Sequence, residues 1–118
     1  MSVKVLVVDD DHCCSGIFKA YLDYKDDWEV ATIASPQKAL KLMDETEFNV
    51  VVSDMRMPEM NGMIFLSTVS EKFPKMIRVL ISAQELSKDT PSYIHYQFQK
   101  GHFKMKDLVE KVTQALSA

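Results

Sequence analysis

The sequence predicts an α/β domain with a five-stranded parallel sheet that helices cover on both faces. Two observations predict this fold class. Short apolar runs rich in β-branched residues alternate with segments of helical periodicity along the whole chain, and polar or acidic residues directly follow those apolar runs. The length of 118 residues suits one domain, so we expect residues 1–118 to form a single unit.

The first part of the chain contains two expected strands and two expected helices. Val3–Val8 is a short β-branched run, typical of a strand buried on both faces. Residues 11–22 carry apolar side chains at helical spacing. Trp28–Ile33 is a second strand, and Ser35 followed by Pro36 marks a helix start, because serine caps a helix and proline suits its first turn.

The middle of the chain repeats this alternation. Residues 48–52 form a third expected strand, which ends at Asp54. Residues 55–62 are punctuated by proline and by an asparagine-glycine pair, which favour a loop. Residues 63–73 are expected to be helical up to the next proline, and residues 77–81 form a fourth strand.

The last part of the chain contains one weak and two clear elements. Residues 85–92 are polar and contain Pro91, so the fourth helix is expected to be short or irregular. Tyr96–Gln99 is a short fifth strand. Residues 105–116 carry apolar residues at helical spacing and predict a final amphipathic helix.

Composition and charge exclude several classes of protein. The chain is 47% hydrophobic and 26% charged, which is ordinary for a globular domain. A formal net charge of −3 gives no overall attraction to nucleic acid or to an anionic membrane, and no apolar run is long enough to span a bilayer. The start of the chain is not a signal peptide pattern. Cys13 and Cys14 are adjacent and make a poor disulfide framework, which favours a reducing cytoplasm.

Charged and hydroxyl side chains follow four of the five expected strands. They are Asp9, Asp10 and Asp11 after the first, Asp54 after the third, Ser82 after the fourth and Lys100 after the fifth. Parallel strands present their carboxyl ends at one edge of the sheet, where ligands bind. Several carboxylates at one edge repel each other unless a cation lies among them, and oxygen ligands suit Mg²⁺. A lysine and a hydroxyl at that edge suit a phosphoryl group, and a carboxylate can accept one as a nucleophile.

Each of these residues also has a purely structural interpretation. Aspartates after a strand often cap the next helix, and taken alone the run from Asp9 to Asp11 is equally well explained in that way. A single aspartate, serine or lysine after a strand is likewise unremarkable. The agreement among four strand ends favours a common site over four unrelated coincidences.

With these motifs in view, the chain resembles a bacterial response-regulator receiver domain, of the chemotaxis-receiver-like superfamily, over essentially its whole length. The resemblance is carried by residues 7–11, 53–58, Asn61-Gly62, 81–83 and Lys100. It implies a flavodoxin-like, doubly wound sheet with strand order 2-1-3-4-5. It also implies a phosphorylation-dependent switch of a two-component phosphorelay, whose phosphoryl donor is a phosphohistidine on a sensor histidine kinase or a phosphotransfer protein.

The resemblance assigns a metal role to several of these residues. Asp54 would be the phosphoacceptor and a Mg²⁺ ligand. Asp10 would bind Mg²⁺ directly, Asp9 would help through water, and the backbone carbonyl of Arg56 would be a further ligand. Mg²⁺ is thus the one cofactor that the resemblance implies.

The remaining motif residues would bind the phosphoryl group. Ser82 would hydrogen-bond a phosphoryl oxygen and move with it, and Lys100 would pair first with Asp54 and then with the phosphoryl group. Ala83 is small and would leave access for the donor. Phosphoryl transfer requires mainly in-line positioning and neutralised oxygens, which these side chains and Mg²⁺ can supply.

Two positions depart from the family pattern. The switch aromatic of the family usually lies three residues before the lysine, where this chain has Gln97 between Tyr96 and Phe98. The family lysine is usually followed by proline, often through a cis bond, whereas Gly101 follows Lys100 here. A cis bond before a non-proline residue costs about 2.5–4 kcal/mol, so we expect a trans bond and a more flexible loop.

Three other functions compete with the receiver interpretation. A flavin-binding domain of similar topology is the least favoured, because no phosphate loop rich in serine, threonine or glycine follows the first strand. Asp9 to Asp11 also fits the Asp-x-Asp signature of haloacid-dehalogenase-like phosphatases, in which Asp9 would be the nucleophile, although no cap domain fits and the usual Gly-Thr is missing. A degenerate receiver that only binds a partner is disfavoured by the complete motif set. The receiver interpretation implies an effector domain absent from this chain or a phosphorylation-dependent dimer, and no direct contact with nucleic acid or membrane.

Overall fold

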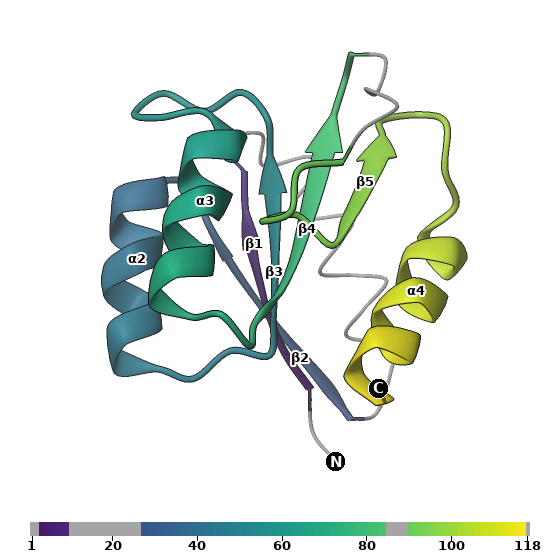
Figure 1. The fold of residues 1–118 in the computed structure, drawn as a ribbon, viewed down its shortest axis with the longest axis horizontal. Helices are drawn as coiled ribbons and strands as arrows, with labels where there is room; N and C mark the ends of the chain where they lie inside the picture. The colour runs from purple at the N-terminus through teal and green to yellow at the C-terminus, as the bar shows by residue number, and fades with distance from the viewer. Residues whose placement is uncertain (1–2, 10–26, 85–89, 118) are drawn as a thin grey trace.

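The sheet has five parallel strands in the order β2-β1-β3-β4-β5, as predicted (Figure 1). The structure, a computed structural model, describes residues 3–9, 27–84 and 90–117. The strands are β1 (Val3–Val8), β2 (Trp28–Ile33), β3 (Val50–Asp54), β4 (Ile77–Ser82) and β5 (Tyr96–Gln99). The helices within the described ranges are α2 (Pro36–Glu45), α3 (Gly62–Lys72) and α4 (Met105–Ser117).

The helices lie on both faces of the sheet, as the sequence predicted. Figure 1 shows α2 and α3 side by side on one face and α4 on the other. Strands β1, β2 and β5 have the predicted bounds. The helix expected over residues 11–22 falls wholly within residues 10–26 and so lies outside the described residues. Residues 85–89 also lie outside them, and residues 90–92 are not helical.

The bounds of the third and fourth strands differ slightly from those expected. Strand β3 begins at Val50, two residues later than expected, and extends to Asp54. Directly before β3, the side-chain oxygen of Asn49 accepts the backbone N–H of Lys4 at 2.8 Å, and the backbone N–H of Asn49 donates to the carbonyl of Lys4 at 2.9 Å. Strand β4 similarly includes Ser82 as its last residue.

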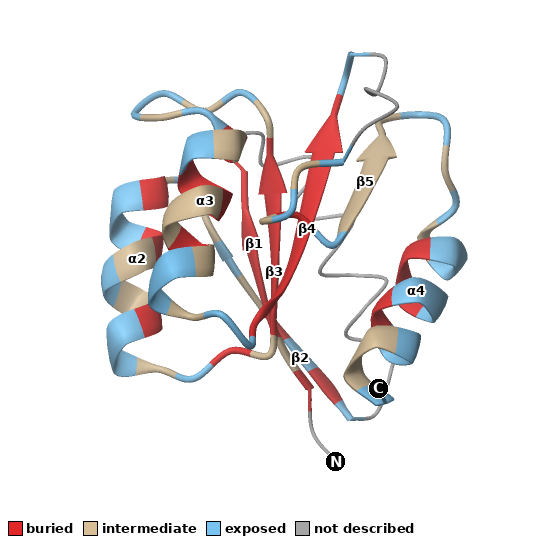
Figure 2. Cartoon of the chain, viewed as in Figure 1, coloured by how far each residue is buried: buried red, intermediate tan, exposed pale blue. Residues whose placement is uncertain are grey.

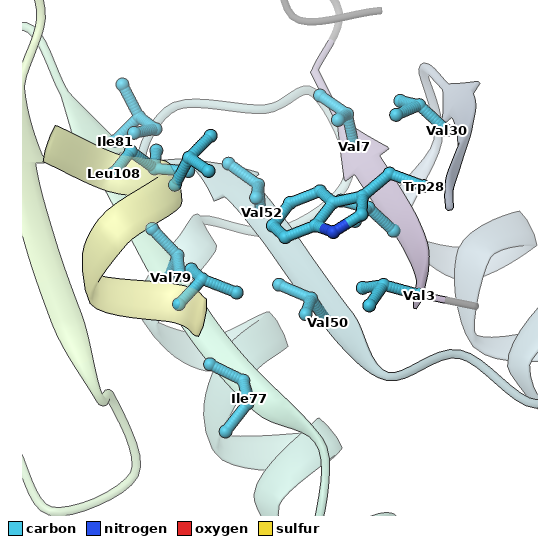
Figure 3. Close-up of a cluster of buried hydrophobic side chains, with 13 residues drawn as sticks. Val3, Val7, Trp28, Val30, Val50, Val52, Ile77, Val79, Ile81 and Leu108 are labelled. Atoms are coloured by element: carbon cyan, nitrogen blue, oxygen red, sulfur yellow. The ribbon is translucent and has the colours of Figure 1, made fainter. Parts of the chain in front are cut away.

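One hydrophobic core lies between the sheet and α4. Trp28 lies among valines of the central strands, and Leu108 of α4 lies near Val52 and Ile81 (Figure 3). These side chains alternate along each strand with those facing the other side, as strand geometry requires. Figure 2 shows the central strands buried along their length, whereas β5 is only partly buried.

The second core lies between the opposite face of the sheet and helices α2 and α3. Phe65 and Leu66 of α3 are fully buried there against Leu6, Val51 and Leu80. Burying a side chain such as Phe65 contributes roughly 2–3 kcal/mol. The two cores fix the sheet from both sides and hold its carboxyl edge in place.

Both helices on this face begin at residues that the sequence marks as caps. The Ser35 hydroxyl oxygen accepts the backbone N–H of Lys38 at 3.2 Å, and Pro36 occupies the first turn of α2, as predicted. The Asn61 side chain accepts the backbone N–H of Ile64 at 2.9 Å and begins α3. Within the described ranges, no helix has both the length and the apolar character needed to cross a membrane.

Candidate functional site

Asp54 and Lys100 form an ion pair at the carboxyl edge of the sheet. The Asp54 side chain ends β3 and is almost buried, and its Oδ1 lies 3.3 Å from Nζ of Lys100. The same Oδ1 accepts the backbone N–H of Met55 at 2.9 Å. Both of these contacts fall on one carboxylate oxygen, so neither of them occupies Oδ2.

Lys100 reaches this position because the backbone ladder of β4 and β5 carries it there. Ser82 is paired with Gln99 at the end of the ladder, and the backbone N–H of Lys100 donates to the carbonyl of Ser82 at 2.8 Å. The Lys100 side chain is 27% exposed, so the ammonium group is partly screened by protein. The sequence prediction that Asp54, Ser82 and Lys100 meet at one edge agrees with this geometry.

Ser82 lies in the same cavity as the ion pair. Its side chain is buried, and its Oγ accepts the backbone N–H of Gln84 at 3.1 Å. The cavity has a volume of about 260 Å³ and is lined by Asp54, Met55, Arg56, Ser82, Ala83, Gln84 and Lys100. The hydroxyl proton of Ser82 is not used by the bond from Gln84, so it can be donated to a ligand in this cavity.

The loop after β3 is folded back against Asp54 at Gly62. The backbone N–H of Gly62 donates to the carbonyl of Met55 at 2.7 Å. A Cβ on Gly62 would lie 2.2 Å from the carbonyl oxygen of Asp54 and 2.9 Å from Cδ1 of Leu80. Only glycine fits this close approach, which gives a steric reason for the Asn61-Gly62 pair in the motif.

A second contact holds the loop after β3 from outside. The Ser35 hydroxyl donates to the Glu59 carboxylate, so the start of α2 is linked to the loop that carries Arg56. Arg56 is exposed and lies beside the cavity.

The residues predicted to bind Mg²⁺ are only partly within the described ranges. Asp9 follows β1, is 6% exposed, and its backbone N–H donates to the carbonyl of Ile33 at 3.1 Å. Asp10 lies outside the described residues. Within them, no three His, Cys, Asp or Glu side chains gather closely enough to hold a metal ion. The donors present, the carboxylates of Asp9 and Asp54 and the carbonyl of Arg56, are hard oxygens that fit Mg²⁺.

The structure shows the backbone at Gly101 and the pairing of Gln97, the two positions that depart from the family pattern. Gly101 has φ 79°, in the left-handed region that favours glycine. The described residues contain no cis peptide bond, so the bond from Lys100 to Gly101 is trans, as expected. Gln97 is half-buried and pairs with Leu80, while Tyr96 and Phe98 pack against the core on the α4 face.

A larger cavity does not coincide with this site. A groove of about 640 Å³ lies at the opposite edge of the sheet, between the ends of α2, α3 and α4. Its walls include Met43, Phe48, Phe73 and Leu116. We assign the chemistry to the smaller cavity, because the ion pair and the Ser82 hydroxyl lie there and not in the groove.

The sequence interpretation missed Gln84 and Arg78. Gln84 lines the cavity and binds Ser82, but no spacing rule marks it. Arg78 is 5% exposed within β4, and a charged residue inside an apolar run is a signal that could have been followed. Burial lowers the pKa of the Arg78 guanidinium from its ordinary value.

Known proteins resemble this chain in sequence and in fold. Residues 5–113 match the family of the response regulator receiver domain. The hydrogenase transcriptional regulatory protein HoxA of Cupriavidus necator is 30% identical over 118 residues, which cover 97% of this chain and 24% of that protein. The chain therefore spans about a quarter of the length of this curated relative.

Solved structures share the whole fold. The signal receiver domain of an HD domain-containing protein from Pseudomonas fluorescens has a TM-score of 0.88 at 20% identity, covering 99% of this chain and 96% of that one. The response regulator protein TrrA of Thermotoga maritima, in complex with Mg²⁺ and BeF, has a TM-score of 0.84 at 23% identity, covering 96% and 98%. At these identities the likeness establishes the fold. Together with the family match over residues 5–113, it shows that the chain belongs to the response regulator receiver domain family, the receiver domains of two-component systems.

Proposed function

We propose that this chain is a phosphorylation-dependent switch in which Asp54 accepts a phosphoryl group. The observation that carries the proposal is the ion pair of Asp54 and Lys100, 3.3 Å apart, in one cavity with the Ser82 hydroxyl. A carboxylate, a cation and a hydroxyl donor around one small cavity form a set suited to an acyl phosphate. Residues 1–118 would act as one receiver domain.

The transfer itself requires little from the protein beyond position and charge. A carboxylate oxygen of Asp54 attacks the phosphorus of a phosphohistidine, the phosphorus–nitrogen bond breaks, and the imidazole nitrogen keeps the electron pair. Carboxylates are ionised at neutral pH, so no general base is needed. Lys100 would offset the charge on the phosphoryl oxygens, and Ser82 would donate its hydroxyl proton to one of them.

Mg²⁺ would be held beside Asp54 by the oxygen donors at the same edge. The residues that would hold it are Asp9, Asp10, Asp54 and the carbonyl of Arg56. The ion would supply positive charge against the phosphoryl oxygens. The position of Asp9 directly after β1, next to the strand β3 that ends at Asp54, supports this role.

The partners follow from the same proposal. The donor would be a sensor histidine kinase or a phosphotransfer protein, and the output a changed contact with an effector or a phosphorylation-dependent dimer. Receiver domains are signalling domains, and we propose that this chain is not a conventional enzyme. A cytoplasmic location belongs to the proposal as well, because Cys13 and Cys14 suit a reducing compartment.

Intact-mass measurement after incubation with acetyl phosphate tests this function. The wild type should gain one phosphate in Mg²⁺ and none when EDTA removes the metal. Asp54→Asn should gain none, while Asp9→Asn should gain it more slowly. An adduct that persists in Asp54→Asn would contradict the proposal. An adduct lost only in Asp9→Asn would instead favour a phosphatase of the haloacid-dehalogenase type.

A further inference from the structure

A buried guanidinium ties the start of β4 to the segment before β5. Arg78 is 5% exposed, and its Nε donates to the carbonyl of Tyr93 at 2.7 Å. Its Nη1 donates to the carbonyl of Met76 at 2.8 Å and to those of Pro74 at 3.2 Å and Phe73 at 3.4 Å. These bonds satisfy the buried charge with backbone carbonyls and fix the chain that leads into β5.

His95 continues this connection by two hydrogen bonds to the backbone of the same arginine. The backbone N–H of His95 donates to the carbonyl of Arg78 at 2.9 Å. The imidazole Nδ1 of His95 accepts the backbone N–H of Arg78 at 3.0 Å. The side chain therefore takes the place of one more rung of the ladder, directly before the pair Val79 and Tyr96. We call these contacts of Arg78 and His95 the Arg78–His95 clamp.

The position of the clamp matters because β5 is short and lies at the edge of the sheet. The strand has four residues and pairs only with β4 in this sheet. The clamp holds its first end, and the bond from Lys100 to Ser82 holds its last end. A shift of one residue along the ladder would turn every β5 side chain to the other face and withdraw Lys100 from Asp54.

We propose that Arg78 and His95 are positioning residues for Lys100, and that protonation of the His95 imidazole releases the clamp. The inference rests on the proposed role of Lys100 beside Asp54. Neutral His95 fixes the register of β5 and so holds the ammonium group at the acceptor carboxylate. In acid, a more mobile β5 places Lys100 less well, and phosphoryl transfer slows.

The chemistry of the acceptor atom explains the acid sensitivity. Nδ1 accepts a hydrogen bond from a backbone N–H, so the neutral ring carries its own proton on Nε2. An imidazolium has protons on both nitrogens and cannot accept this bond.

The surroundings of His95 also favour the neutral form of its imidazole, which is the form that accepts the bond from Arg78. Among the described residues, the charged group whose field shifts its pKa is Arg78 on β4, while Tyr93 and Tyr96 are its titratable neighbours in the chain. Burial first and the Arg78 charge second lower the pKa of His95 below its ordinary value near 6.5. His95 as a whole is exposed, so protons reach it from solvent.

Two substitutions at His95 separate the acceptor from the titration. His95→Asn places an amide oxygen at the same distance from the backbone as Nδ1 and does not titrate. His95→Leu removes the acceptor and keeps a side chain of similar bulk. Amide hydrogen exchange of β5 is measured on the unphosphorylated proteins at about pH 7.5 and about pH 5.5, either side of the ordinary histidine range, and corrected for intrinsic rates.

The hydrogen-exchange measurement tests the Arg78–His95 clamp independently of phosphorylation. The wild type should exchange β5 amides about fivefold faster in acid, the effect of losing one hydrogen bond. His95→Asn should remain protected at both pH values, and His95→Leu should exchange fast at both. An equal acid response in the wild type and His95→Asn would overturn the inference. If His95→Leu fails to fold, the comparison of wild type with His95→Asn still decides it.

The phosphorylation rate with acetyl phosphate tests the link to Lys100. The ratio of the wild-type rate to the His95→Asn rate is compared at each pH, so that protonation of the donor cancels. This ratio should fall in acid, and a constant ratio would overturn the positioning role. A wild type that takes up no phosphate at any pH would refute the proposed function instead, and the exchange result would still decide the clamp.

Discussion

The backbone N–H of Lys100 donates to the carbonyl of Ser82 at 2.8 Å, on the last rung between β4 and β5. This bond places two of the three proposed phosphoryl-binding residues by backbone geometry, whatever their side chains do. The third, Asp54, ends the neighbouring strand β3, and Ile81 of β4 is its partner in the ladder. Three adjacent strand ends therefore set the separations within the site.

Lys100→Ala should slow phosphorylation of Asp54 by about 100-fold, the usual effect of removing one group that stabilises developing charge. The same change should tighten Mg²⁺ binding by roughly threefold to tenfold, because a positive charge a few ångström away no longer repels the cation. Intact mass follows the phosphorylation rate, and titration calorimetry measures Mg²⁺ binding. Lys104→Ala, at an exposed position beyond Gly101, is the matched control and should change neither. Weaker Mg²⁺ binding in Lys100→Ala would contradict the assigned geometry.

Gly62→Ala should destabilise the protein by about 3 kcal/mol, the upper end for overpacking. Its Cβ would lie 2.2 Å from the carbonyl oxygen of Asp54, so the backbone of the site must move. Gly101→Ala is the comparison, since a Cβ there meets nothing within 4 Å. It should cost only about 1 kcal/mol, from the left-handed backbone. Urea unfolding measures both, and equal losses would show that the contact at Gly62 relaxes freely.

Ser82→Ala should weaken the response to beryllofluoride more than Gln97→Ala does. The Ser82 hydroxyl lies in the cavity with Asp54, whereas Gln97 is an amide where the family usually has a switch aromatic. Chemical-shift changes in NMR spectra, recorded with beryllofluoride as the phosphoryl mimic, decide between the two. A larger loss of response in Gln97→Ala would show that the glutamine takes over the switching role.

Stability should fall in acid because of His95. Burial and the Arg78 charge hold the pKa of folded His95 below its ordinary value near 6.5. The unfolded chain therefore binds the proton first as the pH falls. The stabilisation is complete above the ordinary histidine range and is lost as the pH falls through the folded-state pKa. In acid, the free energy of unfolding measured with urea should drop further in the wild type than in His95→Asn. The difference should be less than about 1 kcal/mol, because solvent screens the exposed residue. Parallel curves would exclude His95 as the cause.

The sequence predicted the sheet well because its signal is local. Strands β1, β2 and β5 are short runs whose bounds follow from apolar and aromatic residues between turn formers, and all three have the predicted bounds. Ser35 and Pro36 likewise specify the start of α2 through one turn of backbone. The location of Asp54, Ser82 and Lys100 at one edge of the sheet could be predicted, because parallel strands align their carboxyl ends.

The contacts that the sequence could not predict join distant parts of the chain. Nδ1 of His95 accepts the backbone N–H of Arg78, which lies 17 residues earlier in the chain. The bulk that excludes a side chain at Gly62 belongs to Asp54 and Leu80, and it exists only once the loop has folded back. No periodicity or motif encodes such pairs, because each depends on how two separate elements pack.

Locating the phosphate is the most direct test of the central claim. The protein is phosphorylated with acetyl phosphate and Mg²⁺, and borohydride then reduces the acyl phosphate to a stable alcohol at the modified residue. Tandem mass spectrometry of the digest should find homoserine at position 54 and unmodified aspartate at Asp9. Reduction at Asp9 with Asp54 unmodified would contradict the claim that Asp54 is the phosphoryl acceptor of this receiver domain.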